Sequence, residues 1–188
     1  MGCYEGLKLL YSDFKNRKQE FLNKKILSLS YKGRDILFVF ESIADKSAMA
    51  QTVENNKDIF VIFNKKFYKV LKKSDYLLEM VTLHELTHVI QNITWDYDLD
   101  QFFFADDYWN LPQEIEAYTI VLLQLIAEEQ YGKAIKYLEQ DYPEFLEVLN
   151  FKKFIKKANR WNVPPANLNE FFRSYRDYLT ICEQFNEK

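Results

Sequence analysis

The sequence is poor in the residues that small, cross-linked scaffolds depend on. It has only two cysteines, Cys3 and Cys182, and only four glycines and four prolines among 188 residues. One cysteine pair excludes a disulfide framework and favours free thiols in a reducing compartment. So few glycines indicate a chain of mostly regular structure with few strained turns.

Long apolar runs and an excess of basic charge are also missing. No run approaches the roughly 20 residues that a membrane-spanning helix needs, and the N-terminus lacks a basic start followed by an apolar stretch. Gly6 stands where a myristoylation signal would need Ser or Thr. The net charge of −3 argues against general nucleic-acid binding. The lysine-rich stretches 64–73 and 151–160 are expected to be solvated helix faces, with phosphate contact as the alternative. We therefore expect a cytoplasmic protein without a membrane partner.

The spacing of apolar residues predicts the order of the secondary structure. The chain should form a helix at 4–23, two strands around a turn at 32–35, an irregular polar segment at 44–57, a strand at 58–64, and helices at 74–92, 111–130, 132–140, 143–158 and 167–185. This order favours one α+β domain over residues 1–188, with a small N-terminal β-sheet packed on a mainly helical remainder.

Histidine is as scarce as cysteine, and its placement carries the chemistry. The only two, His84 and His88, lie four positions apart in the stretch HELTH, with Glu85 beside the first. Residues four positions apart lie on the same face of a helix, so both imidazoles can reach one Zn²⁺. Glu85 lies one position further round, where it can take a proton from an attacking water and give it to a leaving amine. The alternative is one buried, hydrogen-bonded histidine and one surface histidine.

Two histidines do not complete a catalytic zinc site, which usually has three protein ligands. Without a third histidine, the remaining ligand must be a carboxylate or a thiolate. Glu114, early in the next predicted helix, is a good candidate.

The pairing of HELTH with the downstream stretch PQEIEAY resembles the gluzincin group of zinc metallopeptidases. The resemblance covers about residues 58–126, and the short ImmA/IrrE-like proteases and proteins of phages and mobile elements look most similar. It implies an active-site helix carrying H-E-x-x-H, and Glu114 as third ligand in a Glu-x-x-Ala pattern that ends at Ala117. Glu116 ranks second. Tyr118 departs from the Asp or Asn that many members carry there, and it is a candidate partner for His84.

Other features leave several interpretations open. Tyr97, Tyr108 and Tyr118 are candidates for stabilising an oxyanion, and core packing is the alternative for each. The five aspartates in the connection 94–110 suggest a solvated loop, an acidic rim for basic substrates, or a calcium loop that lacks the required glycine. The strand at 58–64 is either an edge that pairs with a bound peptide or an ordinary internal strand.

The sequence therefore predicts a small zinc-dependent metallopeptidase. His84, His88 and Glu114 bind Zn²⁺, and Glu85 acts as general base. Its expected partners are polypeptide substrates, with one specific regulatory protein as the narrower option. One alternative is a catalytically inactive, zincin-like protein-binding or regulatory protein, which a phage could encode. A second is nucleic-acid binding through the lysine-rich helices.

Overall fold

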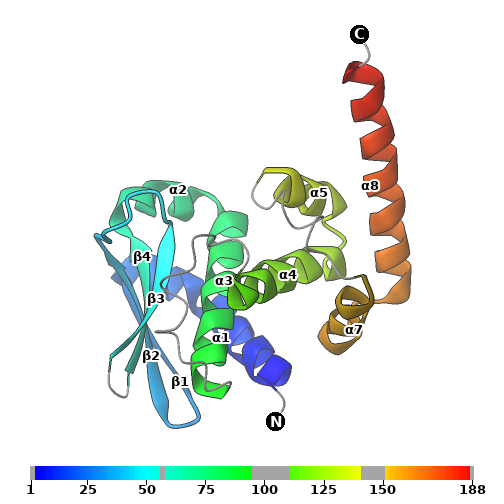
Figure 1. The fold of residues 1–188 in the computed structure, drawn as a ribbon. Helices are drawn as coiled ribbons and strands as arrows, with labels where there is room; N and C mark the ends of the chain where they lie inside the picture. The colour runs from blue at the N-terminus through cyan, green and yellow to red at the C-terminus, as the bar shows by residue number, and fades with distance from the viewer. Residues whose placement is uncertain (1–2, 56–57, 95–110, 141–150, 187–188) are drawn as a thin grey trace. The chain divides into compact units, whose positions relative to one another are not determined.

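The computed structural model describes residues 3–55, 58–94, 111–140 and 151–186. The chain forms two compact units, residues 1–106 and 107–188. Compact units can belong to one domain, so the single domain over 1–188 stays a prediction. The α+β class is confirmed, because a four-stranded sheet lies near the N-terminus and the remaining elements are helices (Figure 1).

The first unit combines one sheet with helices before and after it. Its elements are α1 (Cys3–Lys24), β1 (Ile26–Tyr31), β2 (Arg34–Glu41), β3 (Ala50–Asn55), β4 (Asp58–Asn64), the 3₁₀ turn η1 (Lys65–Phe67), α2 (Tyr68–Lys73) and α3 (Asp75–Thr94). The strand order is β1-β2-β4-β3, with β2 parallel to β4 and the other neighbours antiparallel.

The turn between β1 and β2 follows from local chemistry. Tyr31 pairs with Arg34, which leaves Lys32 and Gly33 as a two-residue loop. Both loop residues have positive φ, 50° and 76°. Two positive φ values are the mark of a type I′ turn, whose twist matches that of antiparallel strands. The predicted turn at 32–35 is therefore confirmed.

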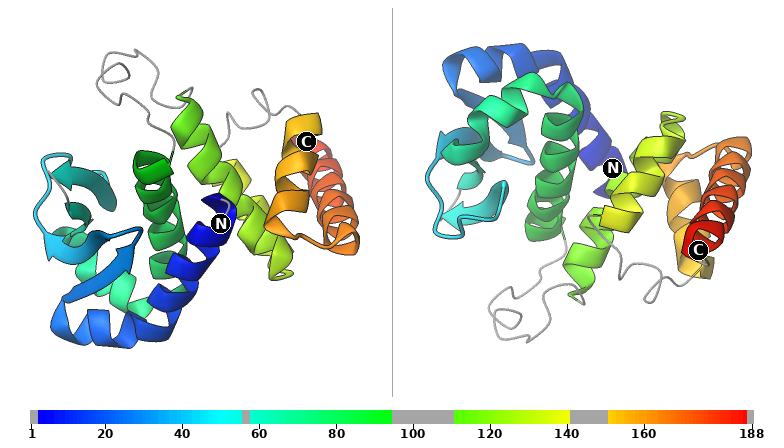
Figure 2. Two further views of the ribbon diagram at one scale, coloured as in Figure 1. Left: turned by 90° about the horizontal axis from the view of Figure 1, so that it is seen from below. Right: turned by 90° about the horizontal axis from the view of Figure 1, so that it is seen from above.

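An aromatic core joins the sheet to its helices. The rings of Phe14 and Phe21 on α1 contact Phe38 on β2, with centroids 5.2 and 6.2 Å apart. Phe21 also contacts Phe63 on β4 at 5.3 Å. All four rings are fully buried. In Figures 1 and 2, α1 and α3 lie side by side against one face of the sheet, and α3 contacts α1, β3 and β4.

One sequence prediction about the sheet is wrong. Residues 44–57 were expected to be irregular, but 50–55 form β3 at the edge of the sheet, paired with β4. The side chains of β3 are exposed or half-buried, so the strand has no alternating apolar signal. Its pairing with β4 determines the strand instead. The stretch 58–64 is consequently an internal strand, as the alternative interpretation held.

The second unit contains only helices among its described residues: α4 (Pro112–Ala127), α5 (Tyr131–Gln140), α7 (Phe151–Trp161) and α8 (Pro165–Asn186). Pro112 opens α4 at its first helical position, where its missing N–H costs nothing. Of the helix predicted at 143–158, the part from 151 is helical and continues to 161. Residues 141–150 lie outside the described part.

Most lysines of the lysine-rich stretches are exposed, as expected, and Lys157 is a half-buried exception. In α2 only Leu71 is buried, and in α7 only the apolar residues Phe154, Ala158 and Trp161 are. The described part of the chain has no helix with the length and apolar character required to cross a membrane.

Candidate metal centre

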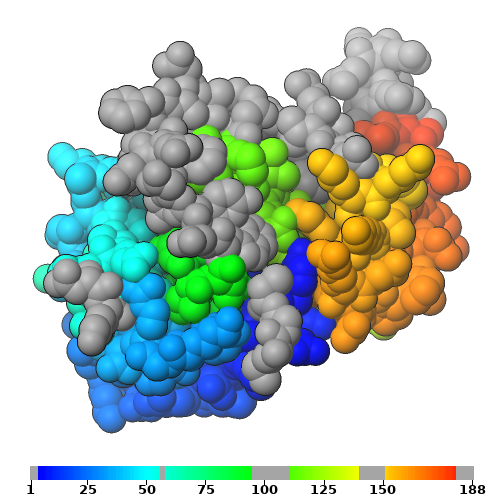
Figure 3. Space-filling view, turned by 60° about the horizontal axis from the view of Figure 1, so that its bottom comes forward, coloured from blue at the N-terminus to red at the C-terminus, as the bar shows by residue number. Residues whose placement is uncertain are grey.

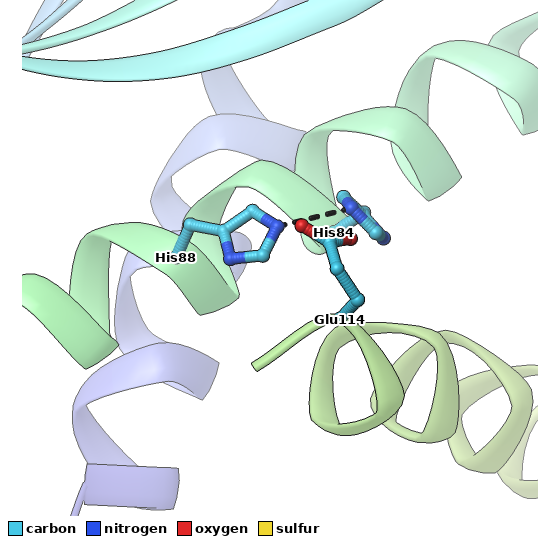
Figure 4. Close-up of side chains that lie close together, drawn as sticks. All are labelled: His84, His88 and Glu114. Atoms are coloured by element: carbon cyan, nitrogen blue, oxygen red, sulfur yellow. Dashed lines mark hydrogen bonds between the residues drawn. The ribbon is translucent and has the colours of Figure 1, made fainter. Parts of the chain in front are cut away.

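The two histidines lie on one face of α3, as their spacing predicts. The Nε2 atoms of His84 and His88 are 3.1 Å apart, and their rings meet edge to face with centroids 4.8 Å apart (Figure 4). Both side chains are half-buried. The alternative of one buried and one surface histidine is therefore wrong.

Gln91, one turn beyond His88, fixes the orientation of that ring. Its side-chain Oε1 lies 2.8 Å from His88 Nδ1, and the residue is only 1% exposed. A carboxamide oxygen can only accept, so Nδ1 must donate its proton to it. The lone pair of His88 then resides on Nε2, the atom that faces His84. A ligand histidine is commonly held by such a partner, and this partner was not among the residues predicted from the sequence.

The spacing of the two Nε2 atoms fits a shared metal ion. Zinc–nitrogen bonds of about 2.0–2.1 Å at a tetrahedral angle place two ligand nitrogens about 3.3 Å apart. The observed 3.1 Å is close to this distance. It also equals an ordinary hydrogen bond from His84 N–H to the lone pair of His88. The spacing is thus compatible both with a shared cation and with a direct hydrogen bond between the two rings.

Glu85 lies in a buried position beside the histidines. It is 6% exposed, although it carries a carboxylate. Thr52 on the edge strand β3 donates its hydroxyl to Glu85 Oε2 at 2.7 Å, and the same hydroxyl lies 3.2 Å from the main-chain oxygen of Glu85. A buried carboxylate is costly unless it is hydrogen-bonded, so Thr52 helps to make this burial possible. The sequence gives no direct signal for this contact.

The third predicted ligand, Glu114, belongs to the second unit. It lies in the first turn of α4 and is 6% exposed. The partial positive charge at a helix N-terminus favours a carboxylate there. Both histidines and Glu85 therefore belong to the first unit, and Glu114 belongs to the second.

The second-ranked candidate, Glu116, has a different role. It is 7% exposed and forms an ion pair with Lys157 on α7. Burial, assisted by the charge of Arg160, lowers the pKa of Lys157 to about 8. The ion pair joins two helices of the second unit, which is a structural function.

The remaining candidates are only partly described. Tyr118 is half-buried on α4, and its ring lies 6.0 Å from that of Tyr137 on α5. Its role as a partner of His84 or as an oxyanion donor stays a prediction. Tyr97, Tyr108 and the five aspartates of the connection 94–110 lie outside the described residues.

No family model, no curated protein and no solved structure matches this chain.

Proposed function

We propose that this protein is a zinc-dependent metallopeptidase of the gluzincin type. His84, His88 and Glu114 would bind the metal, and Glu85 would act as general base. The observation that carries the proposal is the facing pair of Nε2 atoms, 3.1 Å apart, with a buried glutamate next to them on the same helix. This is the arrangement that the H-E-x-x-H motif produces on a helix.

The donor set supports zinc. Two imidazoles and one carboxylate make up a common ligand set of catalytic zinc sites. His84 and His88 would each offer an imidazole nitrogen and Glu114 a carboxylate oxygen as ligand atoms. Glu114 is preferred to Glu116 because Glu116 is already engaged by the ammonium group of Lys157.

The proposed reaction divides the work between the ion and Glu85. A zinc ion would act as a Lewis acid that polarises the scissile carbonyl. As the water oxygen bonds to the carbonyl carbon, Glu85 would accept a proton from that water. The carbon–nitrogen bond then breaks, and Glu85 delivers that proton to the leaving amine. The products are a carboxylic acid and an amine, and no further reactant is needed.

Substrates would be polypeptides in extended conformation. The edge position of β3 supports this, because an edge strand offers main-chain groups to a peptide strand. Thr52 lies on this strand and contacts Glu85, so a peptide paired with β3 would pass near the general base. One specific regulatory protein remains the narrower option. A cytoplasmic location and the absence of a membrane partner belong to the same proposal.

Metal analysis and a matched pair of variants test the proposal. Protein purified without added zinc should contain about one equivalent of zinc, and chelation should abolish peptide cleavage. Glu114→Gln should weaken zinc binding by about 100-fold or more, beyond the usual effect of an outer partner. Glu116→Gln should retain the zinc. If Glu116→Gln loses zinc and Glu114→Gln does not, the ligand assignment is wrong.

The contact between the two imidazoles supports one rival. A metal-free pair that shares a proton could be part of a non-catalytic, protein-binding scaffold. That rival predicts no bound zinc and no zinc-dependent change in stability. It would replace the peptidase proposal if wild-type protein, supplied with zinc, cleaved no component of an unfolded-protein mixture.

A further inference from the structure

We infer that Thr52 is a positioning residue for Glu85, so that the edge strand of the sheet orients the general base. The inference rests on the proposed function, because it gives Glu85 a partner in the peptidase reaction. It adds a residue that lies outside the H-E-x-x-H motif and about thirty positions upstream of it.

The geometry of the contact assigns different tasks to the two carboxylate oxygens. The Thr52 hydroxyl has one proton, and it lies 2.7 Å from Oε2 of Glu85 and 3.2 Å from the main-chain oxygen. The shorter distance marks Oε2 as the main acceptor. With Oε2 held in this way, Oε1 is the oxygen that remains to take a proton from the attacking water.

The kind of partner matters as much as its position. A hydroxyl donor stabilises the buried carboxylate and brings no positive charge to it. Thr52 therefore orients the carboxylate of Glu85 through a neutral group.

Threonine on β3 is well suited to this task. Its branched β-carbon restricts the side chain to few rotamers, and its backbone is fixed by pairing with Val61 on β4. Figure 3 shows the surfaces of β3 (cyan) and α3 (green) on the same face of the first unit. The strand proposed to hold the peptide thus also sets the direction of Glu85.

Kinetics of isosteric variants form the first test. Thr52→Val removes the hydroxyl and keeps the shape, so kcat should fall about 10- to 100-fold, as for other orienting partners, with KM little changed. Thr52→Ser keeps the hydroxyl and should restore most of kcat. Thr82→Val is the control, since the Thr82 hydroxyl donates to the main-chain oxygen of Leu78 on the same helix. The inference fails if Thr52→Val keeps the wild-type kcat, or if Thr52→Ser is as impaired as Thr52→Val.

A second test uses metal-free protein and needs no activity. Urea unfolding is compared for wild type, Thr52→Val, Glu85→Ala and the double variant. Because the two residues are in contact, the effects of the two substitutions should not add. Thr52→Val should lower the urea midpoint of the wild-type protein. It should change the midpoint of the Glu85→Ala variant much less. Additive effects would overturn the inference. If wild type with zinc cleaves no peptide, the peptidase proposal fails, and this cycle alone decides whether Thr52 positions Glu85.

Discussion

Two glutamates on α3, Glu79 and Glu85, are held in opposite ways. Glu79 faces α1, where Lys18 Nζ lies 2.6 Å and Lys15 Nζ lies 3.3 Å from its carboxylate oxygens. Glu85 is six residues further on, on a different face of the helix. It meets the hydroxyl of Thr52 from β3. Both side chains are well covered, at 13% exposure for the Glu79 side chain and 6% for residue Glu85.

The difference is the one expected between a structural carboxylate and the proposed general base. An ammonium partner neutralises the charge of Glu79 and joins two helices, so its effect should appear in stability. A hydroxyl partner satisfies one oxygen of Glu85 and leaves the negative charge uncompensated within that contact. The same residue type on the same helix should therefore show contrasting responses to the same substitution.

The largest expected contrast lies in peptide cleavage. Glu85→Gln should lower kcat by about 10²- to 10⁴-fold, the usual contribution of a general acid–base group, because an amide cannot accept the proton of the attacking water. It should leave zinc bound, since Glu85 is not a proposed ligand. Cleavage is measured with protein whose zinc content has been determined.

Glu79→Gln is the matched control for that measurement. It makes the same chemical change on the same helix, and its carboxylate serves Lys18 and Lys15. Its kcat should stay near that of wild type. The distinction between the two glutamates breaks down if both variants lose activity to the same extent, or if Glu85→Gln remains active.

The sequence predicted most of the first unit because its signals are local. The apolar spacing of α1, the turn at Lys32 and Gly33, and the β-branched run of β4 each depend on neighbouring residues. The strand β3 could not be predicted, because its side chains are exposed or half-buried and its pairing with β4 is a non-local property.

The candidate site divides in the same way. The placement of His84 and His88 follows from helix periodicity alone, and the structure confirms their shared face. The partner of Glu85 comes from a strand that the sequence did not predict. Gln91 was within reach, since it lies three residues after His88 on the same helix. The signal for it was that Gln91 is a polar residue in an otherwise apolar part of α3.

The effect on stability should be smaller, and it should rank the two glutamates in the opposite order. Glu79→Gln should lower the free energy of unfolding by about 1–2 kcal/mol, since it removes the charge that Lys18 meets in a partly covered contact. Glu85→Gln should change it less, because the glutamine oxygen can still accept the hydrogen bond from Thr52. Urea unfolding of the full chain without metal measures both. A greater loss of stability in Glu85→Gln would contradict the assignment of Glu79 as the structural member.

The smallest effect is in the alkaline pH dependence of stability. Partial burial lowers the pKa of Lys18, but its hydrogen bonds to Glu79 and Asp75 outweigh burial and raise that pKa above its ordinary 10.5. A lysine with a raised pKa in the folded state contributes stability that is complete below pH 10.5 and is lost as the pH rises through the folded pKa. Wild type should therefore lose more stability than Glu79→Gln between about pH 9 and about pH 11. Urea midpoints at both pH values measure the difference, in which the titration of other lysines and tyrosines cancels. An equal loss in the two proteins would mean that the pair with Lys18 does not hold Glu79, and the contrast with Glu85 would then rest on activity alone.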